Sequence, residues 1–435
     1  MAVQSIGLIG MGCLVLLIFL RVPVGVAMGL VGLCGYAAVD GWAKAFRVFG
    51  QVPFDVATNY DLSVVPMFVL MGEVATQSGI SSQLYRAARA VFSGLRGAQA
   101  LATIGACAGF GAVCGSSLAT AATMTRIAIP EMRRAGYDDR ISTGSVAAGG
   151  SLGILIPPSI VFVLYAIISQ QSVPRLFAAG MIPGLVLAVL YMLCALGTLA
   201  LKPRWAPRES AGTIGQRLRD LASAWEVVAL FGLSIGGLYA GWFSPTEAAG
   251  VGAFSALVLG FGRRRLTWAK MAQCFGDTIR TTCMLFLIVM SAFIFSYFVV
   301  QTQLPGVLVG WIQAWHVGPI TLIVMLMAFY IVMGCFMDGG GMVLITVPIF
   351  LPLVMQNGYD PIWFGVMLVV VVELGLIHPP VGMNIFVIQA RVPDVPILKV
   401  YQGIIPFLIA PMVLLAILVT WPKLALWLPD LLYNH

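Results

Sequence analysis

Two short stretches of this sequence place oxygen-bearing side chains beside glycines within apolar surroundings. The first is Gly-Ser-Ser at 115–117, and the second is Asp-Gly-Gly-Gly at 338–341. An ionised carboxylate is costly in an apolar environment, and three successive glycines weaken a helix. Hydroxyls, carboxylates and freed backbone carbonyls are, however, the oxygen ligands that hard cations prefer. The residue types therefore predict a site for a small cation, and sodium is the natural occupant.

Two other stretches combine a glycine with a Pro-Pro pair. They read GGSLGILIPPS from Gly149 and ELGLIHPPVGMN from Glu373. Proline removes an amide donor and restricts the residue before it, so each stretch should unwind a helix. Unwound backbone within a membrane is tolerated only where it is buried or lines a cavity. Its carbonyl oxygens suit a cation, while helix N-termini at the same breaks favour an anionic substrate.

The elements that position these stretches are helices in a membrane. Of the 435 residues, 60% are hydrophobic and 9% are charged, and the mean hydropathy is +0.98. Soluble domains carry about 25% charged residues, and a membrane span needs about 20 apolar residues. We therefore expect an all-α polytopic membrane protein whose first apolar run is a transmembrane helix and not a cleaved signal. The eight cysteines form no C-x-x-C pair and are expected to pack.

The basic residues indicate an orientation, because Lys and Arg collect on cytoplasmic loops. With both termini in the periplasm, 20 of the 24 Lys and Arg residues lie on the inner side. This placement explains the net charge of +7 without nucleic acid. The segments at about 98–130 and 320–352 are too interrupted to be simple spans. We expect re-entrant hairpins, the first entering from the cytoplasm and the second from the periplasm.

The two halves of the chain match at a fixed offset of 222 positions. Both Gly136 and Gly358 begin a Gly-Tyr-Asp sequence that reaches Pro-Pro after twenty-one residues. The offset pairs Ser116 with Asp338, and it pairs further sites in the same register. This indicates two inverted repeats, 1–221 and 222–435, each with a hairpin and a discontinuous helix (about 142–169 and 362–391). Inverted repeats with broken helices are typical of secondary transporters.

Several residues allow more than one interpretation. The 98–130 segment is also compatible with a single helix that packs through G-x-x-x-G. Glu373 fits a ligand, a proton carrier or a structural acceptor, and His378 fits either substrate contact or packing. Glu73 and Glu247 are read as structural polar groups. Other features are read simply: Arg86, Arg89 and Arg96 as one face of an interfacial amphipathic helix, and Lys202 to Asp220 as a polar loop.

The motifs together resemble a known family, the large membrane subunit of tripartite ATP-independent periplasmic (TRAP) transporters. The resemblance covers nearly the whole chain and rests on PMFVLMG, GAVCGSSLATAATM, GYDDR, GSLGILIPPSI, SVPRLFAAGMIPG, GWFSPTEAAG and ELGLIHPPVGMN. It implies an elevator-type, sodium-driven importer of organic acid anions, such as C4-dicarboxylates or sialic acid, in the bacterial inner membrane. It also implies a small four-helix membrane subunit and a periplasmic substrate-binding protein as partners. Sodium is the coupling ion, and no other cofactor is expected.

Candidate site residues follow from the motifs and the resemblance. The sodium candidates are Ser116, Ser117, Gly153, Pro157, Asp338, Gly339, Gly375 and Pro379. The substrate candidates are Ser117, Thr120, Ser151, Gly341, His378 and Asn384. His378 stands where the family pattern has Thr, which removes a hydroxyl ligand and adds a titratable ring.

Other functions are weaker alternatives. The nearest is a stand-alone anion symporter, driven by sodium or by protons, that needs no binding protein. A primary pump is disfavoured because none of the five lysines follows a glycine, so no G-K-[ST] phosphate loop exists. An enzyme is not expected: the chain has no H-E-x-x-H, and MDGGG lacks the paired membrane aspartates of an intramembrane aspartyl protease.

Overall fold

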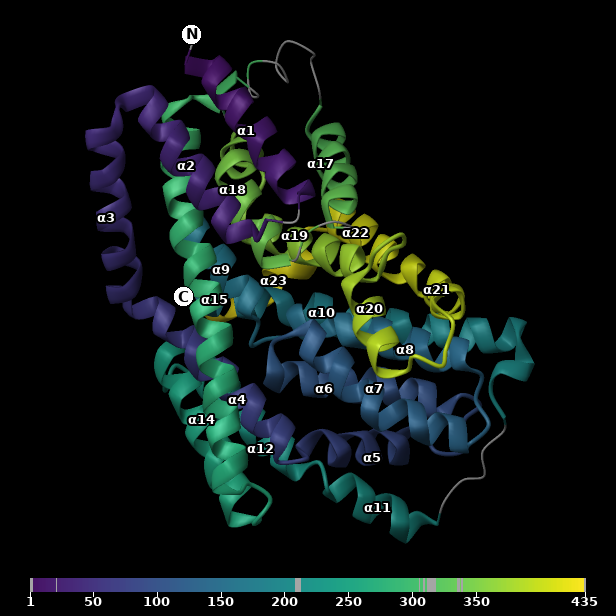
Figure 1. Ribbon diagram of the computed structural model, residues 1–435. Helices are drawn as coiled ribbons and strands as arrows, with labels where there is room; N and C mark the ends of the chain where they lie inside the picture. The colour runs from purple at the N-terminus through teal and green to yellow at the C-terminus, as the bar shows by residue number, and fades with distance from the viewer. Residues whose placement is uncertain are drawn as a thin grey trace.

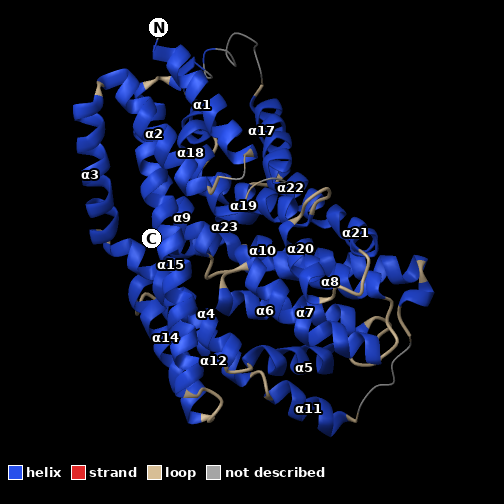
Figure 2. Ribbon diagram, viewed as in Figure 1, coloured by secondary structure: helices blue, strands red, loops and turns tan. Residues whose placement is uncertain are grey.

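The structure is a computed structural model, and it describes residues 3–20, 22–207, 213–304, 306–307, 310, 318–334, 337 and 339–433. Every regular element within these ranges is helical, and no strand occurs in them (Figure 2). The prediction of an all-α protein is therefore confirmed. The predicted sodium ligand Asp338 lies outside the described residues.

The first half of the chain forms helices that surround two interruptions. Its elements are α1 (Val3–Phe19), α2 (Val24–Asp40), α3 (Trp42–Thr58), η1 (Tyr60–Ser63), α4 (Val64–Gln77), α5 (Ile80–Phe92), α6 (Ala98–Cys114), α7 (Ser117–Arg134), α8 (Asp139–Ser151), η2 (Leu152–Ile154), α9 (Ile160–Ser169), α10 (Val173–Leu201), η3 (Pro203–Trp205) and α11 (Ile214–Ala222). Both interruptions, α6 to α7 and α8 to α9, fall within the segments that contain the Gly-Ser-Ser and Pro-Pro motifs.

The second half has a similar succession of elements. They are α12 (Trp225–Phe231), η4 (Gly232–Gly236), α13 (Gly237–Tyr239), α14 (Pro245–Gly262), α15 (Trp268–Gln301), α17 (Pro319–Gly334), α18 (Gly339–Gln356), α19 (Pro361–Ile377), α20 (Met383–Arg391), α21 (Ile397–Ile404), η5 (Ile405–Leu408), α22 (Ile409–Thr420) and α23 (Lys423–Tyr433). The element η4 is a single π-helical turn inside a longer helix. In Figure 1, α2 packs along α15, and α4 packs beside α14.

Five helices in the described part of the chain are long and apolar enough to cross a membrane. The bent pair Tyr60–Gln77 and Ile80–Phe92, which turns by 71°, makes a sixth if it counts as one span. Several shorter apolar helices, among them α6, α9, α17 and α19, belong to the interrupted segments. The multi-pass character thus arises from continuous spans together with helices too short to cross alone.

The polar stretch predicted to be a loop contains a helix, so that prediction is wrong for 214–220. Within α11, Ile214, Leu218 and Leu221 recur at helical spacing on one face, with polar residues between them. All three side chains are exposed, and α11 has no buried residue. The overall polarity of the stretch concealed this period, which is the signature of a helix lying at a membrane surface.

Helix α3 is a second element that the sequence analysis did not assign. It is strongly amphipathic and carries Pro53 within its length. Its buried side chains, Ala45, Val52 and Val56, face α2 and α15, which are its main packing partners. Figure 1 shows α3 running along the outside of the molecule beside α2.

Candidate functional site

The first helix-to-helix turn lies between α6 and α7, at Gly115 and Ser116. Gly115 has a φ of +66°, a conformation that glycine adopts without steric cost. Ser116 is extended and caps α7, its hydroxyl accepting from the Ala119 amide at 3.4 Å. The Ser116 carbonyl accepts from the Thr120 hydroxyl at 2.7 Å. The turn is therefore held by local hydrogen bonds that bring the hydroxyls of Ser116 and Thr120 together at the start of α7.

The first broken helix packs directly against this turn. A Cβ built on Gly153 would lie 2.8 Å from the Ser116 carbonyl oxygen and 2.9 Å from Thr120 Oγ1. A Cβ on Gly115 would lie 2.6 Å from the Pro158 carbonyl oxygen. Both glycines thus permit backbone-to-backbone contact, which brings together Ser116, Thr120, Gly153 and the Pro157–Pro158 pair, whose joining peptide bond is cis.

The second half repeats this contact between α17, α18 and α19. Helix α17 ends at Gly334, and a Cβ on that residue would lie 2.9 Å from Cα of Gly375. Helix α18 begins at Gly339, where a Cβ would lie 2.5 Å from Cγ1 of Val372 and 3.9 Å from Cγ2 of Val161. Since Val161 belongs to α9, the start of α18 also reaches the broken helix of the first half.

The two halves exchange packing partners around the site. Helix α7, the second leg of the first hairpin, packs on α20, which follows the second Pro-Pro pair. Helix α18, the second leg of the second hairpin, packs on α9, which follows the first Pro-Pro pair. A hydrogen bond from Asn384 Nδ2 to the Ala147 carbonyl, at 3.5 Å, adds a polar link between α20 and α8.

The second break lies between α19 and α20. His378 is extended and half-buried directly after α19, and Pro379 and Pro380, joined by a cis peptide bond, follow it. Gly382, with a φ of +63°, is the N-cap residue that precedes α20. The Tyr401 hydroxyl donates to the Pro380 carbonyl and ties the break to α21.

Among the described residues, α19 and α20 carry several of the buried oxygen atoms that have no hydrogen-bond partner. Both carboxyl oxygens of Glu373 are buried, and no hydrogen-bond partner for them occurs among the described residues. Asn384 Oδ1 and Gln389 Oε1 are also buried, and neither has a hydrogen-bond partner among the described residues. Leaving such atoms unpaired is costly, so a bound cation, a proton or a polar ligand would stabilise them.

The remaining predicted residues differ in how they are engaged. Ser117 is buried in the first turn of α7, and Gly341 is buried in the first turn of α18. Ser151 is fully buried, but its hydroxyl donates to the Ala148 carbonyl at 2.8 Å and lies 3.1 Å from the Tyr191 hydroxyl of α10. Ser151 is thus engaged with α10 and not with the contact between the first turn and Gly153.

Three contacts at the site involve residues that the sequence analysis did not predict as site residues. Gly111 packs against Gly153, Gly334 packs against Gly375, and Tyr191 pairs with Ser151. The G-x-x-x-G spacing of Gly111 and Gly115 was a usable signal for the first contact, whereas a tyrosine in an apolar run carries none. The described residues hold no cluster of three His, Cys, Asp or Glu side chains suited to a metal.

Comparison with known proteins identifies the family. The family model described as "Tripartite ATP-independent periplasmic transporter, DctM component" matches residues 11–424. The C4-dicarboxylate TRAP transporter large permease protein of Pseudomonas aeruginosa is 36% identical over 383 residues, which cover 87% of this chain and 88% of that protein. The sialic acid TRAP transporter large permease protein of Vibrio cholerae is 30% identical over 425 residues, with 96% and 97% coverage.

A further relative and a solved structure agree with this result. The 2,3-diketo-L-gulonate TRAP transporter large permease protein of Escherichia coli is 30% identical and covers 96% of this chain and 97% of its own length. The crystal structure of the Alcanivorax borkumensis YdaH transporter superposes with a TM-score of 0.62 at 18% identity, covering 88% and 89% of the two chains, and so shares the fold. This chain belongs to the DctM family and is the large permease component of a tripartite ATP-independent periplasmic transporter, a multi-pass membrane protein.

Proposed function

We propose that this chain carries out sodium-coupled import of an organic acid anion. Three relatives, each at least 30% identical over most of the chain, are named for C4-dicarboxylates, sialic acid and 2,3-diketo-L-gulonate. A carboxylate is common to these substrates, and it matches the preference of helix N-termini for anions. Four helices, α7, α9, α18 and α20, have their N-termini at the turns and breaks of the site.

The observation that carries the proposal is the exchange of partners between the halves. Because α7 packs on α20 and α18 packs on α9, each hairpin leg meets the broken helix of the other half. This arrangement supports two inverted repeats that divide near residue 221. It also supports ion sites formed by Ser116, Ser117, Gly153 and Pro157 on one side and by Asp338, Gly339, Gly375 and Pro379 on the other.

The substrate lies, in this proposal, between the two ion sites. Its contacts come from Ser117, Thr120, Gly341, His378 and Asn384, while Ser151 acts through its bond to Tyr191. Transport proceeds by an elevator movement in which the hairpins and broken helices travel together. The dense packing between α18 and α9 and between α7 and α20 favours their movement as one body.

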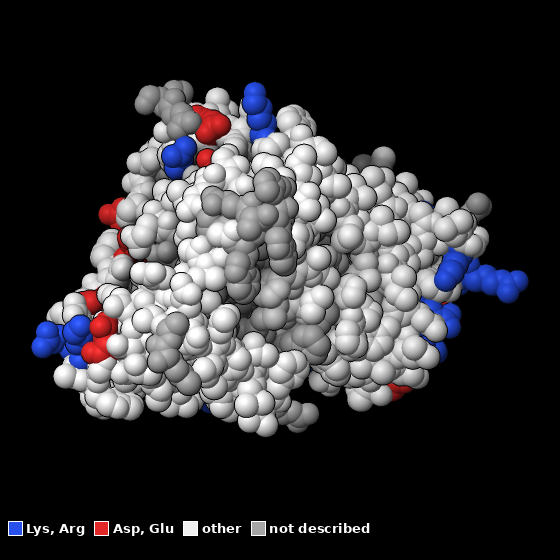
Figure 3. All heavy atoms as spheres, turned by 90° about the horizontal axis from the view of Figure 1, so that it is seen from above, with Lys and Arg blue, Asp and Glu red and all other residues white. Residues whose placement is uncertain are grey.

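We further propose that the termini lie in the periplasm of a bacterium with the chain in its inner membrane. Figure 3 views the molecule from the end of Figure 1 at which α1 begins, and most of that face carries neither acidic nor basic side chains. The arginine-bearing helices α5 and α11 lie at the opposite end (Figure 1). A small four-helix subunit and a periplasmic binding protein complete the transporter.

Uptake into proteoliposomes tests the coupling. The chain is reconstituted with its small subunit, and the binding protein delivers a labelled carboxylate. We expect uptake to require an inward sodium gradient and Asp338→Ala to abolish it, whereas Asp55→Ala, at an exposed position on α3, behaves as wild type. Uptake that ignores sodium, or normal transport by Asp338→Ala, contradicts the mechanism. Uptake without the binding protein indicates the stand-alone symporter instead.

A further inference from the structure

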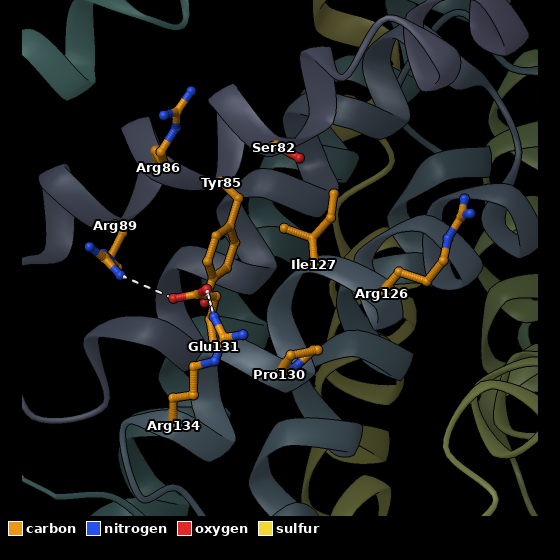
Figure 4. Close-up of a pocket in the computed structure, with 9 residues that line it drawn as sticks. All are labelled: Ser82, Tyr85, Arg86, Arg89, Arg126, Ile127, Pro130, Glu131 and Arg134. Atoms are coloured by element: carbon orange, nitrogen blue, oxygen red, sulfur yellow. Dashed lines mark hydrogen bonds and ion pairs between the residues drawn. The ribbon is translucent and has the colours of Figure 1, made fainter. Parts of the chain in front are cut away.

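A basic pocket lies between α5 and α7 (Figure 4), and none of the residues of the proposed ion sites lines it. It has a volume of about 680 Å³. Figure 4 shows Arg86 and Arg89 on the α5 side and Arg126 and Arg134 on the α7 side, with Glu131 near the centre. The lining contains four arginines and one carboxylate, so the pocket carries a formal surplus of three positive charges.

The single carboxylate neutralises only part of this charge. Glu131 pairs with Arg134 at 2.9 Å and, more weakly, with Arg89 at 3.8 Å. Arg86 and Arg126 form no ion pair within the described part of the chain. The guanidinium groups of Arg86 and Arg126, which point away from Glu131 in Figure 4, therefore remain available to an external anion.

A neighbouring arginine shows that an arginine here can be fully paired inside the protein. Arg133 also lies near the end of α7, outside the pocket lining, and it binds Asp139 and Asp394, each at 2.7 Å. Its charge is matched by carboxylates on α8 and after α20. Arg86 and Arg126 have no such carboxylate partner in the described part of the chain, and repulsion among the pocket arginines would be relieved by a bound anion.

The position of the pocket relative to the membrane follows from α11, which lies against α5. Arg217 Nε donates to the Ala90 carbonyl at 3.1 Å, and Ser223 Oγ donates to the Gln83 carbonyl at 3.3 Å. The apolar face of α11 is exposed, with Ile214 76% accessible, which is typical of a helix at the acyl boundary of a membrane. In this arrangement, helix α5 lies at the level of the lipid phosphates.

We propose that this pocket binds the phosphate group of an anionic phospholipid. Guanidinium groups match phosphate oxygens with two parallel hydrogen bonds, which favours arginine over lysine at such sites. Ile127 and Pro130 form an apolar part of the lining, which suits the glycerol and the start of an acyl chain. Free inorganic phosphate carries the same recognition chemistry, but it gains nothing from these apolar contacts.

The bound lipid joins two elements with different roles. Helix α5 continues from the bent α4, and α7 is a leg of the first hairpin. A phosphate held by Arg86 and Arg126 links α5 to α7 and stabilises the arrangement in which these walls are close. Since a ligand favours the conformation to which it binds more tightly, the lipid also favours this position of the hairpin.

Lipid binding to the full chain tests the proposal. The chain is placed in nanodiscs of phosphatidylcholine with increasing phosphatidylglycerol, and bound phosphatidylglycerol is counted by native mass spectrometry. We expect Arg86→Gln with Arg126→Gln to weaken binding about 30-fold, which equals about 2 kcal/mol, because the change removes the charge-assisted hydrogen bonds of two guanidinium groups to the phosphate. Arg219→Gln, which removes an exposed charge from α11 outside the pocket, should leave binding unchanged.

A second double variant controls for a folding defect. Arg86→Lys with Arg126→Lys keeps the charge but loses the planar fork, so it should fold as wild type and bind with intermediate affinity. Equal phosphatidylglycerol binding by wild type and the double glutamine variant would overturn the proposal. Competition by inorganic phosphate at the same concentration as the lipid headgroup would also overturn it, because the occupant would then be a soluble anion.

Discussion

Replacing Gly153 by alanine tests whether the first proposed ion site depends on contact between a hairpin turn and a broken helix. The new Cβ would lie 2.8 Å from the Ser116 carbonyl oxygen, whereas ordinary contact begins at 3.4 Å, so the turn must retreat by about 0.6 Å. Metal–ligand distances tolerate about 0.2 Å. An overpacked site typically loses 1–3 kcal/mol, and about 2 kcal/mol corresponds to about 30-fold weaker sodium binding.

Thermal unfolding with and without sodium measures this loss. At sodium 100-fold above its dissociation constant, binding stabilises the wild type by about 2.7 kcal/mol. A 30-fold weaker site leaves about 0.9 kcal/mol at the same concentration. Gly197→Ala is the matched control, because its Cβ on α10 meets nothing within 4 Å, and it should keep the full sodium effect. An undiminished sodium effect in Gly153→Ala refutes the reasoning, while no effect in the wild type refutes sodium coupling itself.

Two further predictions concern ion pairs. Glu226 is buried and pairs with Arg263 at 3.2 Å and Arg265 at 3.3 Å, so Glu226→Gln should lower the free energy of unfolding by about 2 kcal/mol in thermal denaturation, and an unchanged midpoint would contradict this. The Arg133 guanidinium lowers the pKa of the Asp394 carboxyl by hydrogen bonding. This pair therefore stabilises the protein above the ordinary Asp pKa of about 3.9, and the stabilisation is lost as pH falls through the lowered value. The difference in unfolding midpoint between wild type and Asp394→Asn should shrink below about pH 4, and a constant difference would refute the assignment.

The interruptions of the helices followed from residue types, because glycine and proline act locally on the backbone. Gly115 adopts a left-handed φ of +66°, as a tight turn between two helices requires. Gly153 and Gly375 lie where two backbones meet, which a side chain would prevent. The positions of the breaks depend on the chain within a few residues, so the motifs were sufficient to locate them, whereas the partners that Gly153 and Gly375 contact are distant in the sequence.

Long-range packing was not available from the same reasoning. The orientation of Ser151 towards Tyr191 depends on how α8 meets α10, forty residues later in the chain. The apolar period of α11 was missed because its polar residues dominate the composition of the stretch. The pairing of α7 with α20 and of α18 with α9 joins elements from different halves, and no local pattern specifies such a partner.

The exchange of partners predicts that the two proposed ion sites influence each other. Gly375→Ala is the counterpart of Gly153→Ala, since its Cβ would lie 2.7 Å from Cα of Gly334. If each hairpin leg also braces the broken helix of the other half, the double variant should deviate from the sum of the single effects by at least about 0.5 kcal/mol. The control double variant combines Gly375→Ala with Gly197→Ala, whose new Cβ has no atom within 4 Å. The effects of these two changes on unfolding should be additive. Additivity of the two site variants, measured by sodium-dependent unfolding, would mean that the sites are independent despite the shared packing.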